Sequence, residues 1–131
     1  MVKSPWKNFS YAELGCKCGK CRADSGMNIS KELMDQVQQL REICGFPFVI
    51  TSAYRCPDHP IEAGKSKPGT HANGQAVDIQ VSGNRAHLLL QEALKMPSLN
   101  GIGVNQKGNH SSRFIHLDVA TGENRPWVWS Y

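Results

Sequence analysis

The clearest hydrophobic pattern in the chain lies between residues 29 and 44. Apolar side chains recur there every three or four residues, the spacing of one helix face: Ile29, Leu33, Val37 and Leu40. Ser30 stands where an N-cap is expected, and Gly45 follows the last apolar position. The pattern therefore predicts a helix over residues 30–44. A second helix is predicted over residues 84–96, where Pro97 ends it.

Four segments have the composition or the alternation of β-strands. They are FVITSAY (48–54), AVDIQV (76–81), GIGVN (101–105) and RFIHLDVA (113–120). In AVDIQV the apolar side chains point to one face, so Asp78 points to the other. In RFIHLDVA the same alternation places His116 and Asp118 together, opposite the apolar positions. Residues 62–70, between the first two strands, are predicted to form a loop.

Two helices and four strands that do not strictly alternate predict an α+β fold, with a central antiparallel sheet and helices packed on one side. The 131 residues suffice for one domain, residues 1–131. A polar, cysteine-containing segment, residues 1–28, is expected to pack onto it. The tail RPWVWSY carries two of the three tryptophans and is predicted to close over the core.

Charge and hydropathy exclude several classes of protein. The formal net charge is +4 with lysine and arginine scattered along the chain, so the concentrated basic face of a nucleic-acid-binding protein is missing. Mild basicity also suits an acidic surface such as a bacterial envelope. No apolar run has the length of a membrane span, and MVKSPWKNFS lacks the apolar stretch of a secretion signal. We expect a monomer without nucleic-acid partner or membrane insertion.

Five cysteines are many for a chain of this length. Four of them stand in CKCGKC and YRCPDH: Cys16, Cys18, Cys21 and Cys56. They could hold a structural zinc ion, form disulfides or remain reduced, because their spacing departs from paired C-x-x-C knuckles. Cys44, in the apolar stretch ICGFPF, is predicted to be a small buried hydrophobe.

The candidate catalytic group consists of a loop histidine and two strand residues. If the strands are neighbours, His71, Asp78 and His116 converge, and Gly74 allows the loop to turn sharply into the strand. Two imidazoles and one carboxylate are a normal ligand set for zinc, and three protein ligands leave the fourth position for water. The sequence therefore predicts one catalytic zinc site.

These residues resemble a known family. The pattern H-x-x-G-x-A-x-D, followed by a strand histidine in F-I-H-L-D, is similar to that of the zinc D-alanyl-D-alanine carboxypeptidases and endopeptidases. TSAYRCPDH is similar to the S-x-Y-R segment of the family, and the R-P-x-x-W-S-Y ending resembles that of small phage-encoded members. The resemblance covers residues 9–131. It implies the fold that these enzymes share with lysostaphin-type peptidases and the zinc domain of hedgehog proteins.

The resemblance implies a role for each matching residue. His71, Asp78 and His116 would be the zinc ligands, and Arg55 would hold a substrate carboxylate or polarise the scissile carbonyl. Several family members carry an acidic general base three residues before the last histidine, but Arg113 stands there and cannot accept a proton.

A second departure is Gly69, where many members have serine. We predict Asp118 as the general base, with His110, Glu62 and Asp58 as alternatives.

Three functions are compatible with these residues. The first is a zinc peptidase that cuts peptidoglycan stem peptides, as expected of a phage endolysin. Such a protein is made in the host cytoplasm without a signal peptide and reaches the cell wall after release by a separate protein. The second is a non-catalytic, zinc-stabilised module that binds cell wall or protein, which the replacement by Arg113 favours. The third is a nucleic-acid-binding zinc ribbon built on the cysteines.

Overall fold

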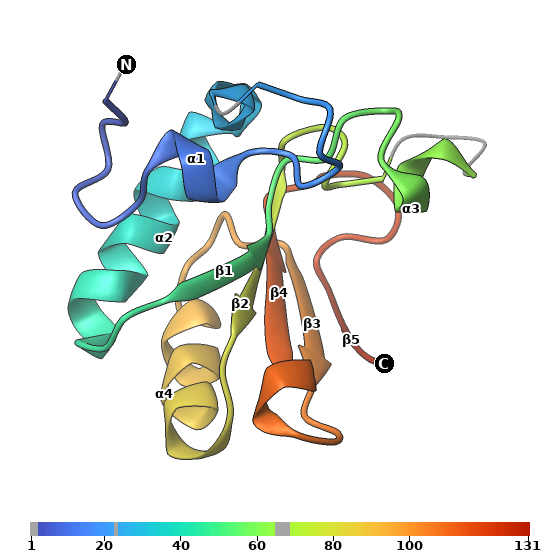
Figure 1. Cartoon of the computed structure of the whole chain (residues 1–131). Helices are drawn as coiled ribbons and strands as arrows, with labels where there is room; N and C mark the ends of the chain where they lie inside the picture. The colour runs from blue at the N-terminus through green and yellow to red at the C-terminus, as the bar shows by residue number, and fades with distance from the viewer. Residues whose placement is uncertain (1–2, 23, 65–68) are drawn as a thin grey trace.

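The computed structural model describes residues 3–22, 24–64 and 69–131, which form a five-stranded sheet with two long helices on one of its faces (Figure 1). The helices are α1 (Tyr11–Leu14), η1 (Ser25–Asn28), α2 (Lys31–Cys44), α3 (Pro60–Ala63), α4 (Gly83–Ala93) and η2 (His110–Ser112). The strands are β1 (Val49–Ser52), β2 (Ala76–Gln80), β3 (Gly101–Asn105), β4 (Phe114–Asp118) and β5 (Trp127–Ser130). The predicted α+β class is confirmed.

Helix α2 has the ends that its sequence predicts. The Ser30 side chain accepts a hydrogen bond from the backbone N–H of Leu33, at 3.2 Å, which satisfies one of the free N–H groups of the first turn. Gly45 ends the helix in the left-handed conformation, with φ of 75°. Helix α4 begins one residue earlier and ends three residues earlier than predicted, at Gly83 and Ala93. The N–H groups of Lys95 and Met96 bond to carbonyls three residues back, which tightens the last turn ahead of Pro97.

The strand order is β1-β2-β4-β3-β5. Strand β4 lies between β2 and β3 and is antiparallel to both, so that His116 pairs with Asp78 on one side and with Gly103 on the other. Strand β5 pairs in parallel with β3, which makes the sheet mixed where antiparallel pairing alone had been expected.

The position of the tail differs from the prediction. It forms the edge strand β5 instead of closing over the core, and Trp127 and Val128 remain 51% and 62% exposed. The tail is held at the edge by the backbone N–H of Trp127, which donates to the Asn100 carbonyl at 2.8 Å, and by Arg125, which pairs with Asp118 of β4. Aromatic composition suggested burial, but these nonlocal contacts decide the position.

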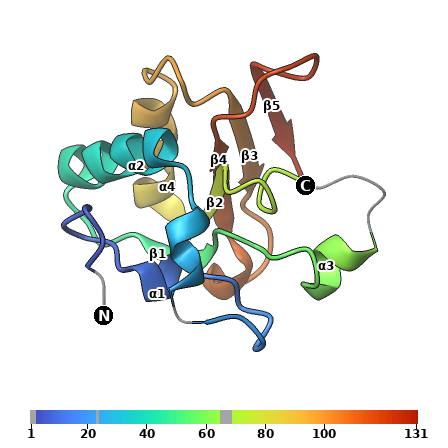
Figure 2. The ribbon, with the colours of Figure 1, turned by 90° about the horizontal axis from the view of Figure 1, so that it is seen from above.

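The hydrophobic core lies between the sheet and the two long helices. Its sheet side is formed by the apolar residues of β2 and β4, including Val77, Ile79, Ile115 and Leu117. The N-terminal segment adds Trp6 and other side chains to the same core. Viewed from above, α2 and α4 lie on one side of the sheet, and α3 and the C-terminus lie on the other (Figure 2). The polar face of β2 and β4 therefore points away from the long helices.

Some short elements differ from the prediction. Strand β1 covers only part of the predicted segment 48–54, and the short helices α1, α3 and both 3-10 turns were not predicted. Of the predicted loop 62–70, residues 65–68 lie outside the described residues.

Cys44 packs against the core but is only partly buried. In the described ranges, no helix combines the length and the apolar character needed to cross a bilayer.

Candidate metal centre

His71, Asp78 and His116 converge on the face of the sheet that points away from the long helices. One ligand atom from each lies within 4.8 Å of the other two. The Asp78 Oδ1 atom is 2.9 Å from Nδ1 of His116 and 3.3 Å from Nε2 of His71. All three residues are buried. The structure thus brings together the three residues that the sequence singled out.

Strand register and one tight turn produce this convergence. Asp78 and His116 are directly opposite partners in the β2–β4 ladder. His71 reaches them through a turn in which Gly74 has φ of 70°. A Cβ atom at Gly74 would lie 2.2 Å from the Asn28 carbonyl oxygen, so glycine is required both by its conformation and by the close approach of the backbone.

In its neutral form, each of the two imidazoles directs a lone pair toward Asp78. Nδ1 of His71 lies 2.8 Å from the Ala53 carbonyl oxygen and must donate to it, because a carbonyl only accepts. Nε2 of His116 lies 2.7 Å from Asp118 Oδ2 and donates in the same way. The opposite nitrogen of each ring is then free of hydrogen when the imidazole is neutral.

Two nitrogen lone pairs and a carboxylate oxygen in one place repel one another unless a positive charge lies among them. Two imidazole nitrogens and one carboxylate oxygen are also donors that suit zinc. The donor chemistry of these residues therefore fits a zinc ion.

The protonation equilibria of the centre also favour a positive charge. Burial alone would raise the pKa of Asp78, but hydrogen bonds with His116 and His71 outweigh it and hold this pKa well below its usual range. Burial alone would lower the pKa of His116, but the hydrogen bonds to Asp118 and Asp78 raise it. The pocket is thus built to hold a cation beside an ionised carboxylate.

Asp118 lies behind His116 and is completely buried. The Arg125 guanidinium donates to both carboxylate oxygens, through Nε at 2.9 Å and Nη2 at 2.8 Å. The backbone N–H of Ala120 adds a third bond at 3.2 Å. Burial would raise the pKa of Asp118, but the bonds from His116 and Arg125 lower it to about 2. The carboxylate is ionised and fully engaged, and it orients the imidazole of His116.

Arg55 lines the same hollow, which has a volume of about 340 Å³ and also includes the three residues of the metal centre. Its Nη1 atom lies 3.3 Å from Glu62 Oε2, and the side chains of both residues are largely buried. Glu62 also accepts a hydrogen bond from the backbone N–H of Gly69 at 3.1 Å. Glu62 therefore holds the guanidinium in place beside the metal centre.

The remaining candidates for the general base do not line this hollow. Asp58 is exposed in the turn before α3. His110 is exposed and bonds through Nδ1 to the Ser82 hydroxyl at 2.7 Å. Arg113 donates from Nε to the Gly108 carbonyl at 2.8 Å and lines a different hollow, beside α4.

The C-terminal tail contributes residues that sequence analysis missed. Trp129 and Tyr131 line the hollow together with Phe114. The ring centroid of Trp129 is 5.1 Å from that of His116, and the Arg125 guanidinium carbon lies 5.0 Å from the Trp129 ring centroid. The tail had been assigned to the core, and the R-P-x-x-W-S-Y similarity was the one signal that it belongs to the site.

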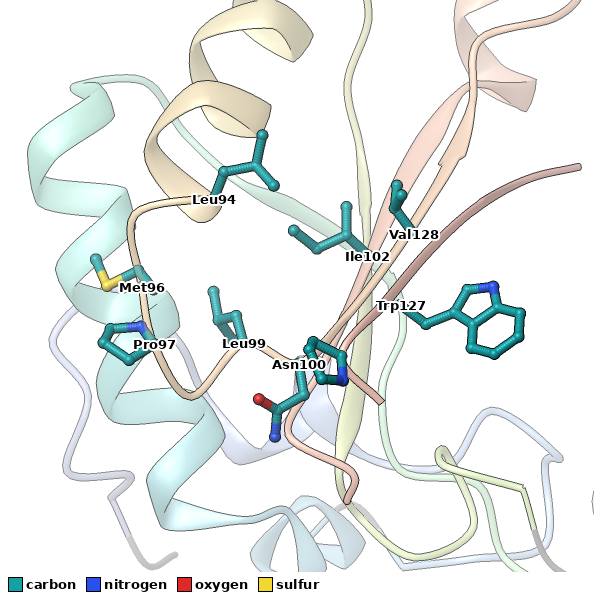
Figure 3. A pocket seen from close by; sticks show the side chains of 9 residues that line it. Leu94, Met96, Pro97, Leu99, Asn100, Ile102, Trp127 and Val128 are labelled. Atoms are coloured by element: carbon teal, nitrogen blue, oxygen red, sulfur yellow. The ribbon is translucent and has the colours of Figure 1, made fainter. Parts of the chain in front are cut away.

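A second hollow, of about 390 Å³, lies between the end of α4 and β5 (Figure 3). Leu94, Leu99 and Ile102 point into it, whereas the indole of Trp127 extends away. Its lining is apolar apart from Asn100 and includes no titratable side chain among the described residues. It therefore offers no group for acid–base or metal chemistry.

An α+β fold that places two imidazoles, a carboxylate and an arginine in one hollow has the side chains of a catalytic metal site. Comparison of the sequence with known families identifies the class, because the family described as Peptidase M15 matches residues 7–118. The chain belongs to this family of zinc metallopeptidases, which resemble D-Ala-D-Ala carboxypeptidases. No curated protein sequence matches the chain.

Proposed function

We propose that this protein is a bacteriolytic zinc peptidase, made by a phage as an endolysin, that hydrolyses peptide bonds in peptidoglycan stem peptides or crosslinks. It would act as a D,D-carboxypeptidase or as an endopeptidase. The observation that carries the proposal is the convergence of two imidazole lone pairs and a carboxylate oxygen in a hollow that Arg55 also lines.

In this proposal, Nε2 of His71, Oδ1 of Asp78 and Nδ1 of His116 would hold the zinc ion. When bound there, zinc would supply Lewis-acid chemistry for a carbonyl and would lower the pKa of a water molecule. Arg55 binds a carboxylate of the stem peptide, because a guanidinium pairs with carboxylate through two parallel hydrogen bonds. Glu62 keeps that guanidinium from swinging away.

Asp118 has a positioning role in this proposal, in place of the predicted role as general base. It is 0% exposed, and Arg125 and Ala120 already donate to its oxygens, so it has no access to a water molecule in the hollow. A carboxylate that accepts the second N–H of a metal-binding imidazole fixes the ring and increases its basicity. Trp129 and Tyr131 line one side of the hollow with aromatic rings, against which a bound peptide would pack.

Mass spectrometry of fragments released from purified peptidoglycan tests the proposal, because it reports activity and the cleaved bond together. We expect release of peptide-containing fragments, loss of release with a chelator and recovery with added zinc. The His116→Ala variant should release nothing. The matched control is His87→Ala, which removes an exposed imidazole on α4 and should leave release unchanged. Intact peptidoglycan after incubation with zinc-loaded protein would refute the peptidase activity.

The endolysin role requires a separate assay. Gram-negative cells whose outer membrane has been permeabilised should clear when the protein is added from outside, and chelation should stop the clearing. Release of fragments from purified peptidoglycan without clearing of such cells would argue against a lytic role while leaving the peptidase intact.

A non-catalytic cell-wall module remains the alternative, and one observation favours it. Asp78 is the only carboxylate among the described residues that line the hollow, and Arg113 occupies the position of the usual acid. The module would bind peptidoglycan in a sedimentation assay and hold zinc, but it would release no fragment. The peptidase would do both.

A further inference from the structure

We propose that Cys16, Cys18, Cys21 and Cys56 hold a second zinc ion, in a structural tetrathiolate site that joins the N-terminal segment to the segment carrying Arg55. This inference is independent of the peptidase activity, because it rests on residues outside the hollow of the metal centre. Of the three alternatives that the sequence left open for these cysteines, namely structural zinc, disulfides and reduced thiols, it selects the first.

The separations of the sulfur atoms carry the proposal. All four Sγ atoms lie within 4.8 Å of one another. Cys18 Sγ is 3.5 Å from Cys21 Sγ and 3.5 Å from Cys56 Sγ. A tetrahedral zinc ion with Zn–S distances of about 2.3 Å needs sulfur atoms about 3.8 Å apart. A disulfide needs about 2.0 Å, and all five cysteines are unpaired in the structure. The four thiols therefore have the spacing of a metal site.

The backbone around the cluster points N–H groups at the sulfur atoms. Lys20 directs its N–H to Cys18 Sγ at 3.4 Å, across a turn in which Gly19 has φ of 84°. The N–H of Cys56 points to Cys16 Sγ at 3.2 Å. A neutral thiol is a weak acceptor, whereas a thiolate bound to metal is a strong one. These donors are arranged for ionised sulfur.

Nearby charge and the lack of regular structure point in the same direction. Four thiolates around one divalent cation carry a net charge of −2, and Lys17, Lys20 and Arg22 accompany the cluster in the sequence. Residues 15–22 form neither helix nor strand, so no backbone ladder holds this part of the chain. A metal ion would fix it, as in other small segments that cannot build a core of their own.

The site would act on the catalytic hollow through the backbone. Cys56 directly follows Arg55, whose N–H donates to the His71 carbonyl at 3.1 Å. The neighbouring Tyr54 N–H donates to the Leu14 carbonyl at 3.1 Å, in the N-terminal segment. The stretch from Ala53 to Cys56 thus lies between the cysteine cluster and the histidine centre. A zinc ion bound to the cysteines would therefore help to hold Arg55 in position, on the side of Arg55 opposite the histidine centre.

Zinc analysis and X-ray absorption of the whole chain test the proposal. The protein should contain two zinc ions per chain, and His116→Ala should retain one, with sulfur neighbours alone at about 2.3 Å. The double variant Cys18→Ser/Cys21→Ser should retain one ion with nitrogen and oxygen neighbours at about 2.0 to 2.2 Å. Cys44→Ser is the matched control and should retain both ions.

Thiol titration of the denatured, chelated protein should detect five thiols, and three or fewer would overturn the proposal by showing a disulfide. A His116→Ala protein without sulfur-bound zinc would also overturn it, and this variant leaves the cysteines untouched. If the double cysteine variant does not fold, Cys18→His serves instead, because a Cys₃His set still binds zinc. We expect this variant to keep two ions with one sulfur neighbour replaced by nitrogen; unchanged sulfur coordination would refute the site. These measurements report zinc content, zinc coordination and thiol number, so they remain valid if the protein has no peptidase activity.

Discussion

Asp118→Asn separates the positioning role of this residue from the role of general base. The substitution keeps the size of the side chain and removes its charge. The wild-type carboxylate accepts a hydrogen bond from Nε2 of His116 at 2.7 Å and two from Arg125. An amide cannot satisfy all of these donors, because one of its two ends is itself a donor. Either His116 loses the acceptor that orients its ring, or Arg125 loses one of its two hydrogen-bond acceptors.

The expected magnitudes follow from these contacts. Loss of a hydrogen-bonding partner behind a metal-binding histidine typically lowers metal affinity 10- to 100-fold. This corresponds to about 1.4 to 2.7 kcal/mol of binding free energy. Breaking a buried ion pair costs about 3 to 5 kcal/mol of folding stability. We expect a value near 3 kcal/mol, because the Arg125 side chain keeps 16% exposure and can regain some hydration.

Zinc competition with a chromogenic chelator measures the affinity, and cleavage of a stem peptide at saturating zinc measures kcat. We expect weaker zinc binding and a kcat within a few-fold of wild type. A general base would behave in the opposite way, with unchanged affinity and a kcat about 10² to 10⁴ lower. That second pattern would refute the positioning role. Glu123→Gln, which removes a charge from an exposed position, is the matched control and should change neither quantity.

Three further predictions concern the tail, the core and pH. Gly103→Ala should lower kcat/KM by displacing the tail, because the added Cβ would lie 2.6 Å from Trp129 Nε1. Activity and tryptophan fluorescence measure the effect. Gly64→Ala, where a Cβ meets open space, is the control and should change neither. Leu40→Ala should lower the free energy of unfolding by about 2 to 5 kcal/mol in urea titrations, since the side chain is fully buried. Because the pKa of His116 is raised in the folded protein, protonation of His116 should stabilise the metal-free fold at pH values below 6.5, the ordinary pKa of histidine. This stabilisation should disappear as the pH rises through the raised pKa. Urea unfolding of metal-free protein and of His116→Gln across this range measures the difference, and a difference that grows with rising pH would contradict the assignment.

The sequence predicted those features that depend on neighbours along the chain. Helix α2 follows from apolar spacing, the Ser30 cap and Gly45, all of which act within one or two turns. The side-chain period of two places Asp78 and His116 on the polar face of their strands without knowledge of the sheet. The structure shows both features. The proximity of His71 was predictable because Gly74 permits the turn that returns it to the strand.

Contacts between distant parts of the chain could not be derived in this way. Aromatic composition led to the prediction that the tail covers the core, whereas pairing with β3 and the contact of Arg125 with Asp118 place it at the sheet edge beside His116. The same ion pair involves Asp118, which the sequence presented as a candidate general base, and no local pattern predicted Arg125 as its partner. The approach of Cys56 to cysteines about forty positions earlier is equally nonlocal.

The amino-acid order alone determined which residues can ligate a metal and which strand face carries them, because backbone geometry repeats over a few residues. Only the tertiary structure decided which carboxylate is accessible, which arginine it pairs with and what encloses the hollow. Those outcomes depend on strand order and on side chains that meet across the sheet, and no short-range periodicity contains that information.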